Sequence, residues 1–135
     1  MKGILVGVIA VICLISATSN SQGKGASELP CGATGTQAEA NACARRDYQK
    51  AGGEMTALYY ELMSELAGYG GGGRHQQKLR RAQASWARYR DATCESEASI
   101  YEGGSIRPAV YYSCMASVTR ERVQRLKEFL AMTRQ

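Results

Sequence analysis

The sequence predicts an all-α protein, a small antiparallel bundle of about three helices stapled by two disulfides. Apolar side chains recur at steps of three and four residues over long stretches, which is typical of helices that bury one face. Glycine-rich segments at 68–73 and 103–104 divide these stretches into three, and no stretch shows the alternation of a strand. The part of the chain expected to be exported holds four cysteines: Cys31, Cys43, Cys94 and Cys114.

Residues 1–19 are typical of a secretory signal peptide. Lys2 precedes an apolar run from Ile4 to Ala17, and the small residues Ala17 and Ser19 fit the −3 and −1 positions of a cleavage site. A run of this length is shorter than the roughly 20 residues that a membrane-spanning helix needs. We therefore expect cleavage after Ser19, a periplasmic or extracellular product, and no stable membrane insertion once the signal is removed.

The charge balance is mildly basic. The formal net charge of +5 becomes +4 without Lys2, because 17 − 1 = 16 basic residues then face 12 acidic ones. Basic residues are interspersed with glutamates in places along the later helices, as in Arg120-Glu121-Arg122, and no block of five or six consecutive like charges is present. Because an exported protein rarely meets nucleic acid, we expect no nucleic-acid partner and favour an envelope polyanion or an acidic protein surface.

The remaining chain is long enough for one domain with one modest core. Residues 20–35 are rich in Ser, Gly and Ala and predict a flexible leader, tied down only by Cys31. Residues 36–135 form the predicted helical domain. Thr36 and Glu39 make a capping box, in which the threonine oxygen accepts a backbone N–H and the glutamate reaches back. The first helix should therefore begin at Gln37.

A heptad-like seam predicts the second helix, from about Arg74 to Tyr101. The only tryptophan, Trp86, falls on this seam, so we expect it in the core rather than at a binding hot spot. The seam positions lie seven residues apart and are Leu79, Trp86, Thr93 and Ile100.

The third helix is expected to follow the glycine pair at 103–104. Ser105 can cap it, and Pro108 is tolerated in its first turn, where no N–H is needed. Its apolar stripe is Tyr112, Met115, Thr119, Val123, Leu126 and Leu130.

The spacing of the cysteines favours one disulfide pairing. Cys94 lies about ten residues before the turn near Gly104 and Cys114 about ten after it, so an antiparallel hairpin brings the two level. That pairs Cys94 with Cys114 and leaves Cys31 with Cys43, although sequence alone allows three pairings. A zinc site would need close pairs such as Cys-x-x-Cys, which are lacking, so we expect no metal and no cofactor.

Three groups of residues carry a family resemblance. They are Cys31 with Thr36-Gln37-Ala38-Glu39-Ala40-Asn41-Ala42-Cys43-Ala44; Gln83, Trp86, Tyr89-Arg90-Asp91 and Cys94; and Gly103-Gly104-Ser105, Cys114, Thr119 and Arg122. Together they resemble the lysozyme inhibitor LprI family over nearly the whole exported chain. The resemblance implies a small, secreted, all-helical, disulfide-bonded bacterial domain of envelope or extracellular location. The family is named after inhibition of lysozyme by a lipoprotein member. Ala40 and the long glycine run depart from the family's pattern.

Three polar residues near the cysteines have a structural and a recognition interpretation. Arg90 and Asp91 lie within one turn of Cys94 and close in height to the third helix, which predicts ion pairing between helices, with surface recognition as the alternative. Asn41 is expected to bond to the leader backbone, and its alternative role is to face a partner.

The sequence does not predict an enzyme. The single histidine, His75, has no nameable catalytic partner, and the short motifs of hydrolases, zinc proteases and phosphate-binding loops are lacking. We therefore expect a solvent-exposed histidine after the glycine turn and a binding protein rather than a catalyst.

Two functions remain. The first is a secreted inhibitor of c-type lysozyme, and the alternative is a structural or interaction protein of the bacterial envelope without inhibitory activity. Many lysozymes are basic, so two positive bodies would repel at long range and a local contact must outweigh that. The loop from Tyr69 to His75 is the candidate partner-binding site, because Arg74 there can reach the paired carboxylates of a lysozyme cleft. The simpler interpretation of this loop is a turn that joins two helices.

Overall fold

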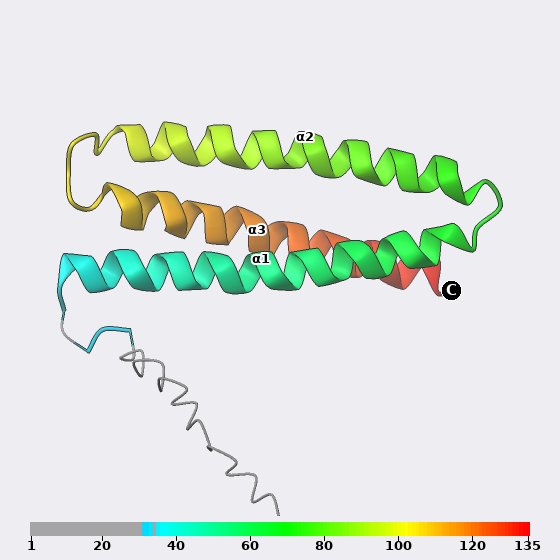
Figure 1. The fold of residues 1–135 in the computed structure, drawn as a ribbon, viewed down its shortest axis with the longest axis horizontal. Coiled ribbons are helices and arrows are strands. Elements are labelled where there is room, and N and C mark those ends of the chain that lie inside the picture. Colours follow the sequence, from blue (N-terminus) through cyan, green and yellow to red (C-terminus); the bar gives the residue numbers. More distant parts are fainter. Residues whose placement is uncertain (1–30, 34) are drawn as a thin grey trace, which may run out of the picture.

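The structure, a computed structural model, describes residues 31–33 and 35–135, and this part of the chain folds into three antiparallel helices (Figure 1). These are α1 (Gln37–Ala67), α2 (Gly72–Ser99) and α3 (Arg107–Thr133). The predicted fold class is confirmed, and α1 begins at the residue expected from its capping box. The predicted signal peptide and most of the predicted leader lie outside the described residues.

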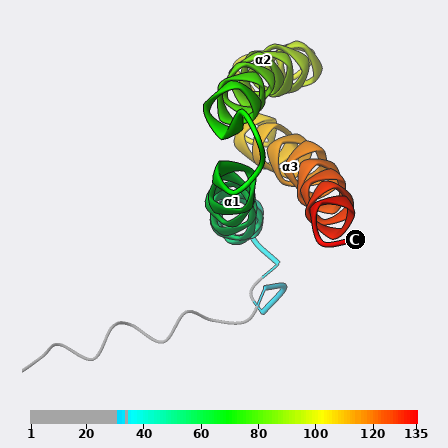
Figure 2. The same ribbon diagram turned by 90° about the vertical axis from the view of Figure 1, so that its right-hand side faces the viewer.

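The three helices pack unequally. α1 packs most extensively on α3, while α2 packs more on α3 than on α1, so α3 lies against both other helices (Figure 2). Buried alanines on facing helices, including Ala51 on α1 and Ala116 on α3, keep side chains short where the backbones approach.

Two apolar clusters fill the interior. The larger lies toward the end with the α1–α2 turn and draws on all three helices; its buried members are Leu62, Leu66, Leu79, Leu126 and Leu130. The smaller surrounds Cys94, Cys114 and Met115, with Tyr48 packed against it. Thr119, fully buried on α3, has a hydroxyl without a hydrogen-bond partner among the described residues. The bundle thus has a leucine-rich half and a disulfide half.

Glycines in the left-handed region close both turns. Gly71 has φ 75° directly before α2, and Gly103 has φ 75° between α2 and α3, a conformation that glycine adopts without the steric cost of a Cβ. Because α2 starts at Gly72 rather than near Arg74, both Arg74 and His75 belong to its first turn and not to a loop.

The expected seam of α2 is wrong at its end. Ile100 lies beyond the last residue of α2 with 81% of its surface exposed, and the last buried residue of the helix is Ala98. Trp86 is only half-buried, although core placement was expected. A straight helix drifts by about 20° per heptad, so a strict seven-residue spacing leaves the buried face within a few repeats.

The expected cap of α3 is also wrong. The residue before the helix is Ile106, which makes no side-chain capping bond, while Pro108 does lie in the first turn as expected. The backbone carbonyl of Ser105 instead accepts a hydrogen bond of 3.1 Å from the Asn41 amide of α1. The serine therefore contributes to fixing the α2–α3 turn against α1.

Candidate functional site

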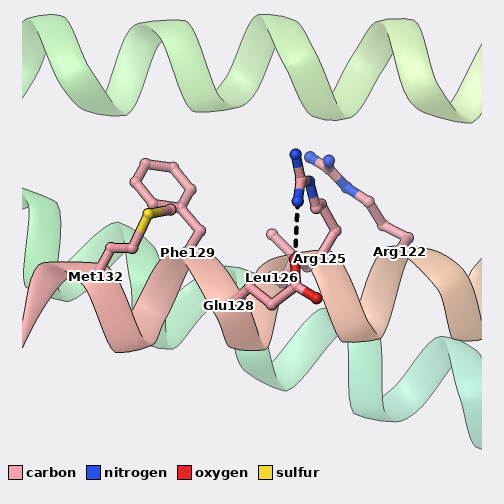
Figure 3. A pocket seen from close by; sticks show the side chains of 6 residues that line it. All are labelled: Arg122, Arg125, Leu126, Glu128, Phe129 and Met132. Atoms are coloured by element: carbon pink, nitrogen blue, oxygen red, sulfur yellow. Dashed lines mark hydrogen bonds and ion pairs between the residues drawn. The ribbon is translucent and has the colours of Figure 1, made fainter.

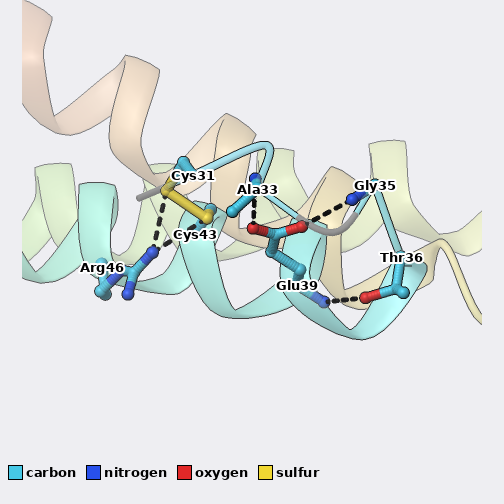
Figure 4. Close-up of a disulfide and its surroundings, with 7 residues drawn as sticks. All are labelled: Cys31, Ala33, Gly35, Thr36, Glu39, Cys43 and Arg46. Atoms are coloured by element: carbon cyan, nitrogen blue, oxygen red, sulfur yellow. Dashed lines mark hydrogen bonds between the residues drawn. A yellow bond between two sulfur atoms is a disulfide. The ribbon is translucent and has the colours of Figure 1, made fainter. Parts of the chain in front are cut away.

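The start of α1 is held by a compact set of polar contacts and one disulfide (Figure 4). Thr36 Oγ1 accepts the Glu39 backbone N–H at 3.2 Å, and the Glu39 carboxylate accepts the N–H groups of Ala33 and Gly35 at 2.8 and 2.9 Å. The Cys31–Cys43 disulfide closes the same segment. The end of the leader is thus held by Glu39 as well as by Cys31, which was the only tether expected.

The second disulfide fastens the α2–α3 hairpin. Cys94 and Cys114 are bonded with their Cα atoms 5.4 Å apart, as their equal distance from the turn predicted. Tyr111 packs against this disulfide, and burial raises the pKa of its hydroxyl, with a further contribution from the negative charge of Asp91. Both cystines lie in the half of the bundle that contains the α2–α3 turn.

The opposite end of the bundle holds the predicted partner-binding residues. The Tyr69 hydroxyl donates to the Thr133 carbonyl at 2.7 Å, and the Tyr69 ring meets the His75 ring edge-on at 6.3 Å. Arg74 is exposed, and no hydrogen bond or ion pair joins its guanidinium to the other described residues. The structure therefore places all three residues together, on a turn tied to the end of α3 rather than on a free loop.

The same end is closed by Arg134. Its guanidinium bonds Glu61 and Glu65 of α1 at 2.7 Å each, and these hydrogen bonds raise its pKa. Arg134, the residue that follows α3, is thereby joined to α1 beside the glycine turn.

A shallow groove runs along the side of α3 that faces α2. Figure 3 shows Arg122, Arg125 and Phe129 pointing from α3 toward α2 over a hollow of about 300 Å³. Burial lowers the pKa of the Arg122 guanidinium below its usual value, and arginine nevertheless remains a cation in proteins. Hydrogen bonding from Arg125 lowers the pKa of Glu128. The groove offers an apolar floor edged by two arginines, of which Arg125 is ion-paired with Glu128, a surface suited to binding rather than to proton transfer.

Trp86 lines a neighbouring hollow, which shares Arg122 and Arg125 with this groove, and its ring lies between two cations. The guanidinium carbon of Arg90 lies 5.0 Å from the ring centre and that of Arg122 lies 5.8 Å away. Arg122 also donates to the Gln83 side chain at 3.0 Å, and Arg90 lies over the Tyr48 ring of α1 at 5.6 Å. These cation–π contacts anchor α2 to both neighbours.

Replacing Trp86 by alanine is expected to lower the free energy of unfolding by about 2 kcal/mol, less than the 3 to 5 kcal/mol typical of a fully buried aromatic ring. The reason is that the ring is half-buried and its loss removes two cation–π contacts. Urea unfolding of the variant and the parent checks this, with Tyr60→Ala on the exposed face of α1 as control. A loss above 4 kcal/mol would contradict the half-buried placement.

Arg90 and Asp91 do not form the expected ion pair between helices. Arg90 bonds its own neighbour Asp91 at 2.7 Å, and it reaches α1 through the Tyr48 ring instead. Asp91 points to solvent because the facing segment of α3, residues 108–119, carries no charged side chain. The helices are joined here by aromatic and disulfide contacts.

No group of three residues suited to holding a metal ion occurs in the described part of the chain. None of its helices is both long and apolar enough to traverse a bilayer.

Comparisons with known proteins identify relatives. A profile of the family described as lysozyme inhibitor LprI matches residues 30–126. An uncharacterised protein of Rhizobium meliloti (strain 1021) is 29% identical over 133 residues, covering 90% of this chain and 91% of the relative. Among solved structures, a DUF1311 family protein from Pseudomonas putida KT2440 matches with a TM-score of 0.65 and 26% identity, over 71% of this chain and 95% of that one.

Proposed function

Because the chain belongs to the lysozyme inhibitor LprI family, we propose that it is an exported protein that binds and inhibits a c-type lysozyme without catalysing a reaction. The family match over residues 30–126 is the observation that carries the proposal. The two disulfides support export, since cystines persist in oxidising compartments outside the cytoplasm.

The shape of the molecule supports inhibition by obstruction. A lysozyme cleft receives a polysaccharide strand and holds two carboxylates beside the bond to be cleaved. The bundle is elongated, so its ends are narrower than its sides and can enter such a cleft (Figure 1). Inhibition then follows from exclusion of the substrate.

The test is the rate at which lysozyme clears a peptidoglycan suspension. We expect the oxidised protein, in excess, to slow clearing severalfold, and the reduced and alkylated protein to do so much less, because the Cys94–Cys114 disulfide holds α2 against α3 and the Cys31–Cys43 disulfide holds the leader on α1. Undiminished clearing would favour the alternative function, a structural or interaction protein of the envelope.

The glycine-turn end is the first surface to test, through Arg74. If its guanidinium pairs with the cleft carboxylates, we expect Arg74→Ala to weaken the complex about tenfold, mainly through faster dissociation. The fold should be unaffected, since the Arg74 side chain is exposed and bonds no other described side chain. Surface plasmon resonance with immobilised lysozyme measures the rates, with Arg81→Ala as a matched control on the same helix. Equal dissociation of both variants and the parent would place the contact elsewhere.

A further inference from the structure

The α2–α3 turn exposes a cluster of large apolar side chains. Ile100, Tyr101 and Ile106 are exposed by 81%, 43% and 42%, and they fall within seven residues of chain. Single exposed apolar residues are ordinary on soluble proteins, but a cluster is typical of an interaction site. We call these three residues the apolar tip.

The tip is held rigidly. Gly104 N–H donates to the Tyr101 carbonyl at 2.9 Å, and Arg107 bonds the carboxylates of Glu95 and Glu102 across the turn. The Asn41 bond to the Ser105 carbonyl and the Cys94–Cys114 disulfide fix the turn to α1 and α3. An ordered surface loses little conformational entropy on binding, which favours its use as a docking element.

Basic and acidic residues occupy different halves of α2, and the acidic half is the one that ends at the apolar tip. Residues 72–90 hold six basic and no acidic side chains: Arg74, Lys78, Arg80, Arg81, Arg88 and Arg90. Residues 91–107 hold four acidic side chains, Asp91, Glu95, Glu97 and Glu102, against one base, Arg107, so their formal charge is 1 − 4 = −3. The adjoining start of α1, residues 37–47, holds Glu39, Arg45, Arg46 and Asp47, so its formal charge is 2 − 2 = 0.

This distribution opposes the helix dipole. Cations are unfavourable near a helix N-terminus and carboxylates near its C-terminus, yet α2 has no acidic residue in its first turn and has Glu97 in its last. Helix stability therefore does not explain the pattern. A requirement for a negative surface around the apolar tip explains the distribution of charge along α2.

We propose that the apolar tip, at the end of the bundle opposite Arg74, is the docking surface for a basic protein in place of the glycine-turn end, and, resting on the proposed function, that this partner is a cationic c-type lysozyme. The carboxylates steer a positive partner, and the apolar residues supply the buried contact. By helical rise the six basic residues of α2 lie about 15 to 39 Å from Ile100, roughly two to five Debye lengths at physiological salt, so screening weakens their repulsion of a positive partner at the tip. An anionic lipid surface or a second acidic tip would be repelled.

The test is the affinity of the oxidised protein for a basic c-type lysozyme, measured by calorimetric titration. We expect Ile100→Ser combined with Tyr101→Ser to weaken binding by tenfold or more. Tyr60→Ser removes a ring from α1 that is more exposed than Tyr101, at 66% against 43%, and should change the affinity by less than about twofold. Since all three side chains are exposed, melting temperatures should stay close to the parent's.

Charge reversal supplies an independent readout. Glu97→Lys should lower the association rate severalfold, whereas Glu121→Lys, the same change on the middle of α3, should have little effect. Neither glutamate forms an ion pair with other described residues. Association of the parent should slow as salt rises from about 50 to 300 mM.

The outcomes separate this inference from the proposed function. If the tip substitutions leave both inhibition and binding unchanged, the apolar tip is not the docking surface, and the inhibitor function stands. If the parent binds lysozyme without inhibiting it and the tip substitutions abolish that binding, the tip is the docking surface and the inhibitor function is overturned. No binding by the parent would overturn both.

Discussion

Replacing Leu126 by alanine is expected to lower the free energy of unfolding by about 3 to 4 kcal/mol, because the change leaves a cavity in the centre of the larger apolar cluster. Leu126 is 1% exposed and packs with leucines from all three helices. In a domain of this size such a loss is a large fraction of the total stability.

Urea unfolding measures this effect through the transition midpoint at constant slope. Met132→Ala is the matched control, since it shortens a side chain of similar size on the same helix that is 62% exposed. The control should differ from the parent by less than about 0.5 kcal/mol. A Leu126→Ala protein as stable as this control would show that the helices do not meet where the structure places them.

Removing the Cys94–Cys114 disulfide, by Cys94→Ala with Cys114→Ala, is expected to cost about 3 kcal/mol in the chain-entropy model. The bond closes 20 residues of chain and both sulfurs lie in the smaller core cluster, so its loss loosens the hairpin and the packing together. The melting temperature should fall by more than ten degrees.

Removal of the Cys31–Cys43 disulfide provides the comparison for this fall in melting temperature. Cys31→Ala with Cys43→Ala frees a segment that lies outside the helices, and Glu39 still bonds its backbone at Ala33 and Gly35. We expect a smaller fall in melting temperature. A larger fall than that caused by losing Cys94–Cys114 would contradict the hairpin as the main covalent brace.

Local sequence features predicted the helices and the two disulfides. Thr36 caps α1 because a threonine oxygen can reach an orphan N–H whatever the tertiary fold. The equal distances of Cys94 and Cys114 from a glycine turn sufficed to pair them, since helical rise is fixed. Such features depend on a single helix start or a single hairpin, and not on how all three helices pack together.

The predictions that the structure contradicts concern contacts between helices. Trp86 and Ile100 share a heptad pattern, yet how α2 inclines against α3 decides which of them is covered, and no spacing rule contains that inclination. The Arg90–Asp91 pair formed within α2 because α3 offers aromatic rings there instead of charges. Interhelical partners are properties of the packed bundle.

The candidate surfaces were partly readable from sequence. Tyr69, Arg74 and His75 do lie together, but the start of α2 at Gly72 turns the expected loop into a helix end. The apolar tip was missed because Ile100 was assigned to the core. The separation of basic residues 72–90 from acidic residues 91–102 was visible in the sequence and is the signal that points to this end of the helix.

The most direct test of lysozyme inhibition is a titration at fixed enzyme concentration. Increasing amounts of the oxidised protein are added to lysozyme, and the initial rate of peptidoglycan clearing is followed together with the mass of the enzyme. A binding inhibitor predicts that the rate falls with the molar ratio and levels off once the enzyme is saturated, while the lysozyme stays intact. Unchanged clearing at a tenfold molar excess, or cleavage of the lysozyme, would contradict the account.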